Sequence, residues 1–428
     1  MKEQKLFNKN FSIIIIGQLI SMFGNAIQRF AFSLYILELT GSAALFSLII
    51  SLAILPAIFL GPIGGAIADR MNKGRIMVVL DFCCSLIIGG FAVFIYGNDN
   101  QILWIAILMF VLSTISSIYE PTVRASIPSV ISKEHYTAGN SMVSQISALT
   151  MLLGPIAAGF LYGFFGLKVI LIINMISFFA SAVMELFLTI PYEKIKMTES
   201  AITTYIEDIK ETLKFLYEDK PIVLTILFFA AGLNLFMTPL YTVGVPYVEK
   251  IILGVSDEMY GFSEAILGIG MILGAILSPW IARYNPFEKL HRFFVLMGIA
   301  ILGMGLCLTP WLPGNTSGPL IAYVLFTFSG FILMFLVANI NIQAMTFIQL
   351  QVPQAIMGKT MALTAALSTA LMPIGQVIFG QLYDKLSFDL ILIYVGVMGL
   401  TFAAAKILQR INERPMNPQT ILINKKNI

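Results

Sequence analysis

The sequence predicts an all-α membrane protein with twelve transmembrane helices, arranged as two pseudo-symmetric bundles of six. Three observations predict this fold class. First, 58% of the 428 residues are hydrophobic and 11% are charged, with a mean hydropathy of +0.88. Second, runs of roughly 20 apolar residues, long enough to cross a bilayer as a helix, recur along the chain. Third, the basic residues gather on one side of the predicted membrane.

The first bundle is predicted to occupy residues 1–190. Six apolar segments lie in this part of the chain: 11–37, 43–68, 76–97, 102–122, 139–163 and 167–190. A helix satisfies all its backbone hydrogen bonds internally, which is why such segments are expected to cross lipid as helices. Short polar connections between them let each helix return across the membrane.

A polar linker at 191–220 separates the two bundles. Apolar residues recur at helical spacing within it, among them Ile202, Ile206 and Ile209, with charged residues on the other face. Thr204 and Glu207 have the spacing of a capping box. We therefore expect an amphipathic helix on the cytoplasmic surface that joins the bundles, with a regulatory output as the alternative.

The second bundle is predicted at 221–409, followed by a cytoplasmic tail at 410–428. Its six apolar segments are 221–248, 259–282, 292–312, 319–345, 359–383 and 388–409. Two sets of six helices are the pattern that duplication of a six-helix unit leaves. The even number of crossings places both termini on the same side of the membrane.

The positions of the 26 Lys and Arg residues indicate the orientation. With cytoplasmic termini, Lys168, Lys250 and Lys385 fall outside and Arg29 lies within a span, whereas all the others fall on the cytoplasmic side. The net charge of +3 therefore reflects orientation signals and contact with anionic lipid. We expect a multi-pass protein of the cell membrane and no nucleic-acid partner.

The sequence offers no enzyme site, cofactor site or metal site. The three cysteines, Cys83, Cys84 and Cys307, lie in apolar segments without metal-ligand spacing, and His135 and His291 lie in predicted connections. Neither a catalytic triad nor a histidine metal site has a candidate in the spans. We therefore expect no enzymatic activity.

The end of the second segment and the connection after it carry a glycine followed by one acid and three bases: Gly65, Asp69, Arg70, Lys73 and Arg75. It resembles the signature loop between the second and third helices of the major facilitator superfamily, although Asn72 replaces a usual glycine and Gly74 a usual base. The resemblance implies the major facilitator fold and a latch that holds the two halves together on the cytoplasmic side. A basic loop that only sets the topology is the alternative.

The fifth segment contains Gly154, Pro155 and Gly159. These residues resemble the fifth-helix motif of exporters that exchange drugs for protons, and the chain is similar to the branch of macrolide-efflux-like and siderophore-exporter-like proteins. Small residues permit close helix packing, and a proline leaves a carbonyl without its helical partner. Ordinary packing is the alternative interpretation.

The family resemblance implies that the first, fourth, seventh and tenth helices line a central cavity. Polar residues on these helices are the substrate candidates: Gln18, Asn25, Gln28, Arg29, Asn234, Thr238, Tyr241, Asn339 and Gln343. On the first helix, most of these share one face with Ser21 and Ser33. Because an arginine facing lipid is costly, Arg29 should either recognise an anionic or carbonyl-rich cargo group or tether neighbouring carbonyls.

Coupling to protons requires a carboxylate whose protonation changes between states. The candidates are Asp81, Glu120 and Glu264. Asp81 could instead be a partner of the latch, and Glu120 could be an ion-pair partner of Arg124 one turn away. Members of the resembled branch often carry an acid where this chain has Asn25.

Together these features predict an exporter of an amphiphilic small molecule, drug-like or siderophore-like, that works by alternating access with inward proton flow. We expect a monomer surrounded by membrane lipid. An importer or facilitator of the same fold is one alternative, and a membrane sensor without transport is another.

Overall fold

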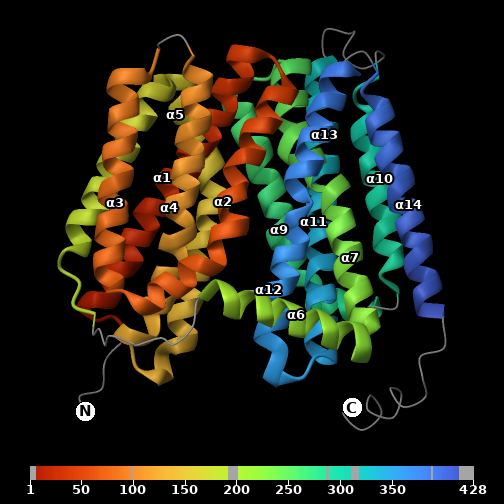
Figure 1. Cartoon of the computed structure of the whole chain (residues 1–428). Coiled ribbons are helices and arrows are strands. Elements are labelled where there is room, and N and C mark those ends of the chain that lie inside the picture. The colour runs from red at the N-terminus through yellow and green to blue at the C-terminus, as the bar shows by residue number, and fades with distance from the viewer. Residues whose placement is uncertain are drawn as a thin grey trace. The chain divides into compact units, whose positions relative to one another are not determined.

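The computed structural model describes residues 6–97, 100–190, 201–285, 289–309, 318–386 and 389–413, and every regular element in these ranges is helical (Figure 1). The first part of the chain contains α1 (Lys9–Thr40), α2 (Ala43–Arg70), α3 (Lys73–Gly90), η1 (Phe91–Ile95), α4 (Gln101–Val130), η2 (Lys133–His135) and α5 (Tyr136–Glu185). The second part contains α6 (Ala201–Asp219), α7 (Pro221–Phe236), η3 (Leu240–Gly244), α8 (Val245–Tyr247), η4 (Val248–Ile252), α9 (Asp257–Tyr284), α10 (His291–Leu306), α11 (Gly318–Gln351), α12 (Gln354–Ala370), α13 (Met372–Lys385) and α14 (Ile391–Glu413).

Helix α5 consists of two helical segments that meet at Gly166. This residue has φ 70° and ψ 177°, a backbone conformation that is not helical and is open to glycine. The break lies between the predicted segments 139–163 and 167–190. The two segments are therefore joined by a single residue and not by a loop.

Within the described residues, ten helical stretches are long and apolar enough to cross a membrane. One of them, Lys133–Glu185, has 53 residues and contains the break at Gly166. A further apolar helix, His291–Leu306, has 16 residues. The prediction of an all-helical, multi-pass membrane protein is confirmed by these elements.

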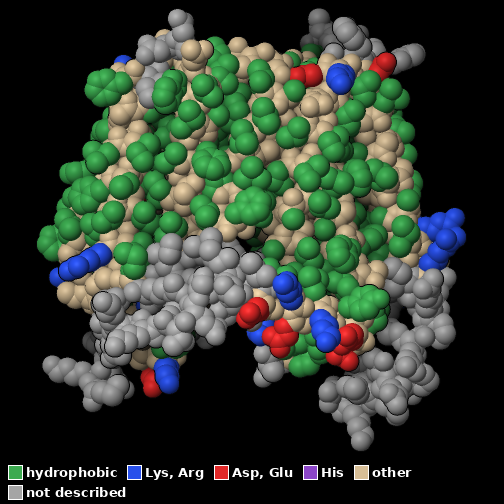
Figure 2. Space-filling view, viewed as in Figure 1, with side chains coloured by type: hydrophobic (Ala, Val, Ile, Leu, Met, Phe, Trp, Pro, Cys, Tyr) green, Lys and Arg blue, Asp and Glu red, His purple; other side chains and the backbone are tan. Residues whose placement is uncertain are grey.

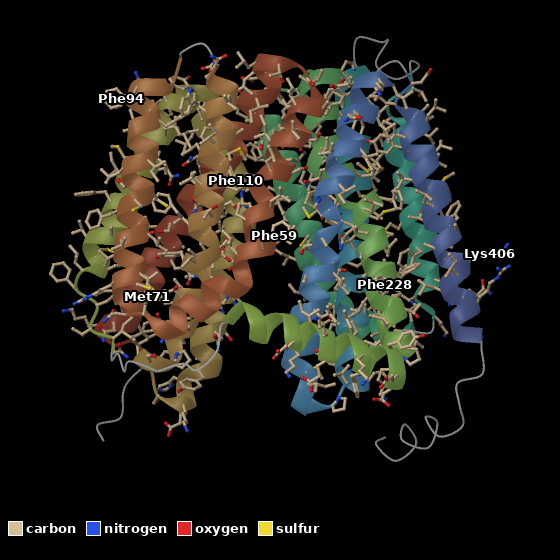
Figure 3. All side chains as sticks on the ribbon, viewed as in Figure 1. Phe59, Met71, Phe94, Phe110, Phe228 and Lys406 are labelled. Carbon is tan, nitrogen blue, oxygen red and sulfur yellow. The ribbon has the colours of Figure 1, made fainter. Side chains whose placement is uncertain are left out.

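Hydrophobic side chains cover most of the visible surface of the helices, and charged side chains gather at the helix ends (Figure 2). Phe59, Phe94 and Phe228 are labelled examples on the outer surface (Figure 3), with exposed fractions of 69%, 76% and 58%. Each would cost roughly 1.5–3 kcal/mol if left in water, a cost that lipid removes. The exposed apolar belt is what a helix bundle in a bilayer requires.

The chain divides into two compact units: 1–265 with 352–385, and 266–351 with 386–428. The first unit packs α1 against α5, α2 against α4 and α13, and α3 against α5. Its core includes Phe11, Met77, Tyr119 and Val143. The second unit packs α10 against α11 and α14. The domain boundaries predicted at 190 and 220 stay a prediction.

The helix predicted in the linker is present as α6, which packs against α7 and α12. Thr212 and Leu216 are buried, whereas Tyr217 is exposed, so α6 has a buried face and an open face. Lys359 of α12 donates a hydrogen bond of 2.6 Å to Glu211 of α6. The linker helix is therefore fastened to the helices that follow it. Residues 191–200 lie outside the described residues.

Candidate functional site

Arg29 lies in the body of α1, far from either helix end, and its side chain is exposed. Glu120 of α4 is also exposed and lies near enough to Arg29 to attract its charge. Charged side chains at such positions in apolar helices need water or a polar partner around them. The two residues therefore form a charged region beside α1 and α4, with each other as one source of that polar partner.

The other polar residues of α1 have different surroundings. Asn25 is half-buried, whereas Gln18 and Gln28 are buried, with exposed fractions of 6% and 2%. Gln28 accepts a hydrogen bond from Asn174 of α5. Its side chain leaves the helix about 100° away from that of Arg29. Gln28 thus contacts a neighbouring helix and not the accessible region expected from the sequence.

The three predicted residues of the seventh span form a chain of polar contacts. The Asn234 amide donates a hydrogen bond of 2.9 Å to the carbonyl oxygen of Ser368 in α12. Thr238 donates to Asn234 at 3.0 Å, and the Tyr241 hydroxyl lies 3.5 Å from that of Thr238. In this conformation, these side chains join α7 to α12 in the way that polar residues commonly join membrane helices.

Asn339 and Gln343 are buried on α11, in the second unit, with exposed fractions of 0% and 6%. The Asn339 amide donates to the Phe335 carbonyl oxygen of the preceding turn. Within the described part of the chain, Asn339 Oδ1 and both polar atoms of the Gln343 amide have no hydrogen-bond partner. An unsatisfied buried polar group costs roughly 1–3 kcal/mol, and the substrate role of this pair stays a prediction.

In the first unit, the ends of several helices meet in a region that we call the junction, formed by residues 38–47, 159–163, 250, 257–261 and 380–384. Asp384 at the end of α13 accepts hydrogen bonds from the Ser42 hydroxyl at 2.6 Å, the Ala43 amide at 2.8 Å and the Ala44 amide at 3.1 Å. It therefore caps the N-terminus of α2, where the helix dipole favours a negative charge.

A second cluster of charges strengthens the junction. Lys250 of η4 forms ion pairs with Asp257 of α9 and, at 3.5 Å, with Glu38 of α1. The Tyr162 hydroxyl of α5 donates a hydrogen bond of 2.6 Å to Glu38. The Lys250 side chain is only 9% exposed, so its charge is partly shielded from water. The cluster joins α1 and α5 to η4 and α9.

The glycines of the fifth-helix motif lie at close helix contacts. A Cβ atom on Gly159 would lie 2.7 Å from the carbonyl oxygen of Asp257, and one on Gly261 of α9 would lie 2.9 Å from that of Pro155. A Cβ atom on Gly154 would lie 3.0 Å from the Cβ atom of Ala26 in α1. The backbones of α5 and α9 therefore approach each other at a distance that only small residues permit.

The three predicted proton carriers have different surroundings. Asp81 on α3 is 1% exposed, whereas Glu120 is exposed, as described above. Glu264 of α9 is half-buried and lies within hydrogen-bonding reach of Tyr260, whose ring stacks on Phe30 at 4.6 Å between centroids. The three acids therefore lie in separate environments.

The structure also shows an acid that sequence reasoning did not select. Glu185, at the end of α5, is 1% exposed, and its carboxylate interacts with that of Asp81. An acidic residue inside an apolar segment was the available signal, but nothing local in the sequence pairs it with Asp81.

The predicted latch is described only in part. Helix α2 continues to Arg70, but the surroundings of Gly65 and the side chains of Asp69 and Arg70 are outside what the structure describes. Lys73 begins α3, and the backbone amide of Arg75 donates to Asn72 Oδ1 at 3.1 Å. Asn72 is thus the N-cap of α3, which gives a physical reason for an asparagine where the resembled family has glycine. The latch stays a prediction.

Comparisons with known proteins agree over most of the chain. The model of the Major Facilitator Superfamily matches residues 14–376. Macrolide efflux protein A of Streptococcus pyogenes is 21% identical over 386 residues, covering 90% of this chain and 92% of its own. The staphyloferrin A transporter of Staphylococcus aureus is 23% identical over 284 residues, covering 66% and 70%.

Solved structures show the same fold. A bacterial homologue of the iron transporter ferroportin, in an inward-facing state, has a TM-score of 0.67 and 16% identity, covering 93% of this chain and 98% of its own. The peptide transporter POT in complex with alafosfalin has a TM-score of 0.70 and 15% identity, covering 96% of both chains. At these identities the likeness concerns the fold alone.

Proposed function

Because this chain belongs to the Major Facilitator Superfamily, and is therefore a multi-pass cell-membrane transporter and not an enzyme, we propose that it exports an amphiphilic small molecule. Export proceeds by alternating access and is driven by inward proton flow. The family membership agrees with the resemblance predicted from residues 64–75. The cargo class, the direction and the coupling ion are the proposed parts.

The observation that carries the proposal is the contrast between Arg29 and the junction. Arg29 and Glu120 have exposed, charged side chains in the body of α1 and α4, where lipid is an unsuitable environment. The junction, by contrast, closes one end of the first unit through Asp384 and Lys250. A region open to water beside helices that are joined at one end is what one state of an alternating-access transporter requires.

Similarity to macrolide efflux protein A supports outward transport, because it extends over most of both chains. The motif of Gly154, Pro155 and Gly159 supports the same direction. Two of its members lie at the contact of α5 with α9, which has to part and re-form during a transport cycle. Similarity to the staphyloferrin A transporter supports a siderophore as the second cargo class.

We propose twelve transmembrane helices with cytoplasmic termini, and bundles at 1–190 and 221–409. Twelve follow if Lys133–Glu185 crosses twice, with its turn at Gly166, and His291–Leu306 also crosses. The positions of Lys168, Lys250 and Lys385 then place the junction at the extracellular side. The protein functions as a monomer, with lipid around its apolar belt.

Transport into everted membrane vesicles tests the proposal. Vesicles from cells that express the protein should accumulate a radiolabelled macrolide when respiration acidifies their interior, and a protonophore should abolish the accumulation. Vesicles from cells without the protein are the control, and a siderophore is the second probe. Accumulation in right-side-out vesicles instead would support import, and binding without flux of either probe would support a sensor.

A further inference from the structure

Four helical segments of the first unit enclose two acidic side chains, Asp81 of α3 and Glu185 of α5. Both residues are 1% exposed. The hydroxyl of Ser21 on α1 donates a hydrogen bond of 3.2 Å to Asp81 Oδ2. The hydroxyl of Tyr119 on α4 donates one of 2.7 Å to Glu185 Oε1. Each acid is therefore held by a donor from a different helix.

The two acids belong to one polar cluster. Ser181 of α5 lies 3.3 Å from Ser21, hydroxyl to hydroxyl, and Ser181 and Tyr119 both lie within hydrogen-bonding reach of Asp81. The carboxyl groups are near enough for their charges to interact. The cluster thus contains more acceptor oxygens than its hydroxyl donors can satisfy.

One oxygen of the cluster has no donor. Glu185 Oε2 is buried and has no hydrogen-bond partner among the described residues. In the described part of the chain, the other titratable side chains that interact with the pair are Tyr119 and Cys84, which are neutral near pH 7 in their ordinary states. Within the described ranges, neither acid forms an ion pair with Lys, Arg or His.

Two ionised carboxylates in this site would repel each other without a cation to offset them, in surroundings that exclude water. A proton on one of them removes one negative charge. It also converts an acceptor oxygen into a donor, and so allows a hydrogen bond that the unpartnered Glu185 oxygen lacks. A bound proton therefore removes the repulsion between the two carboxylates and supplies a donor for the unpartnered Glu185 oxygen.

We propose that Asp81 and Glu185 form a proton-binding site that holds one proton between them in the conformation described here. The site supplies the coupling that the proposed function requires and gives Asp81 a partner. Ser21 and Tyr119 lie on α1 and α4, the helices that carry Arg29 and Glu120. Movement of either helix changes the donors that face the acids, and thereby releases or takes up the proton.

Infrared difference spectroscopy tests proton binding without a cargo. The full-length protein in lipid nanodiscs is compared between acidic and alkaline buffer, and the carbonyl stretch of a protonated carboxylic acid is recorded. The wild type should show a band from a buried acid that exchanges slowly in D2O. The band should weaken in Glu185→Gln and in Asp81→Asn and disappear in the double variant. Glu134→Gln, which changes an exposed acid, is the matched control and should keep the band.

Tyr119→Phe provides a variant that leaves both acids in place. Removing its hydroxyl should shift the pH at which the band appears, because the phenol is the donor to Glu185. A wild type without the band, a double variant with the full band, or a Tyr119→Phe variant with an unchanged profile would overturn the proposal. Melting temperatures of all variants identify any that fail to fold.

A metal cation is the competing occupant, because the cluster is rich in oxygen. Melting temperatures in sodium chloride and in choline chloride at equal ionic strength distinguish the two. Stabilisation by sodium in the wild type that disappears in Glu185→Gln would overturn the proton assignment, whereas equal melting in both salts supports it. Neither measurement uses a cargo, so failure of the macrolide export assay leaves this result unaffected.

Discussion

The hydroxyl of Ser42 donates a hydrogen bond of 2.6 Å to the carboxylate of Asp384, which joins residues 342 positions apart. The same carboxylate accepts the Ala43 and Ala44 amides, so it satisfies the first two amides of α2, whereas the Ser42 hydroxyl oxygen accepts the Leu45 amide at 3.2 Å. Any motion that separates α13 from α2 has to break three hydrogen bonds to one acid. Asp384 is therefore well placed to stabilise a closed junction.

Asp384→Asn should open the junction. A hydrogen bond to a charged group contributes about 1.5–3 kcal/mol, and about 1.4 kcal/mol changes an equilibrium tenfold. Labelling of Ala44→Cys by a membrane-impermeant maleimide, in a background without the three native cysteines, should be at least about tenfold faster in the variant. Asp389→Asn, an exposed acid nearby in the sequence, should leave the rate unchanged, and equal rates in all three proteins would contradict the capping role.

Gly159→Ala should impair transport by preventing closure of α5 against α9. The added methyl group would lie 2.7 Å from the backbone oxygen of Asp257, which has little freedom to move. Overpacking of this kind costs about 1–3 kcal/mol. Gly163→Ala is the matched control, because its methyl group would come close only to the end of the flexible Glu258 side chain and would lie 3.6 Å from the Asp257 Cβ, an ordinary contact. If both variants export a macrolide at the wild-type rate, the close contact is unimportant for transport.

Arg29→Gln separates cargo recognition from a structural tether. A cation at this depth costs at least roughly 2.5 kcal/mol in lipid, so it needs water, a partner or cargo. If Arg29 recognises cargo, affinity should fall for an acidic ligand and stay nearly unchanged for a neutral one, at an unaltered melting temperature. Arg29→Lys should restore part of the affinity. A lower melting temperature with equal loss for both ligands would instead identify a tether.

Neutralising the coupling acid should separate uphill export from exchange. Of Glu120→Gln, Asp81→Asn and Glu264→Gln, we expect Asp81→Asn to keep counterflow of a macrolide but to lose accumulation against a gradient. A neutral side chain cannot carry the proton, although it still permits exchange. Normal accumulation in all three variants would show that the coupling residue lies elsewhere.

Asp69→Asn should lower turnover with little effect on binding, because the residue is predicted to hold the two halves together in the outward-open state only. Flux of a macrolide and the amount of protein in the membrane are measured together. Asp219→Asn, at the end of the linker helix, is a control for the loss of one acid on the same predicted side of the membrane. Unchanged flux at a normal protein level would remove the latch assignment.

The extent to which the sequence predicts this molecule depends on how local each feature is. Apolar length predicted most spans, and the division at Gly166 falls between two predicted segments. The seventh span was predicted as one regular helix. In the structure the α-helix ends before Met237, and the span continues through π-helical turns beside Pro239 and Pro246. Prolines disturb the hydrogen-bond ladder in ways that hydropathy does not record.

The polar contacts also divide into those that local spacing predicts and those that depend on the packing of distant segments. Helical spacing grouped Arg29 with Asn25, but it could not show that Gln28 pairs with Asn174, since that contact depends on how α5 packs against α1. The pairing of Asp81 with Glu185 and of Asp384 with Ser42 likewise requires distant segments to meet. Such pairs have no local pattern, which is why sequence reasoning selected Asp81 without its partner and did not select Asp384.

The capping of α2 by Asp384 has a consequence for how the chain tolerates substitution. Two of the three donors are backbone amides, which are present whatever side chain follows at Ala43 or Ala44, except for proline. The contact therefore constrains the two positions unequally. It requires an acid at position 384, whereas position 44 accepts almost any residue. Covariation between the two positions would be absent even though they touch, so evolutionary couplings would overlook one of the closest links in the junction.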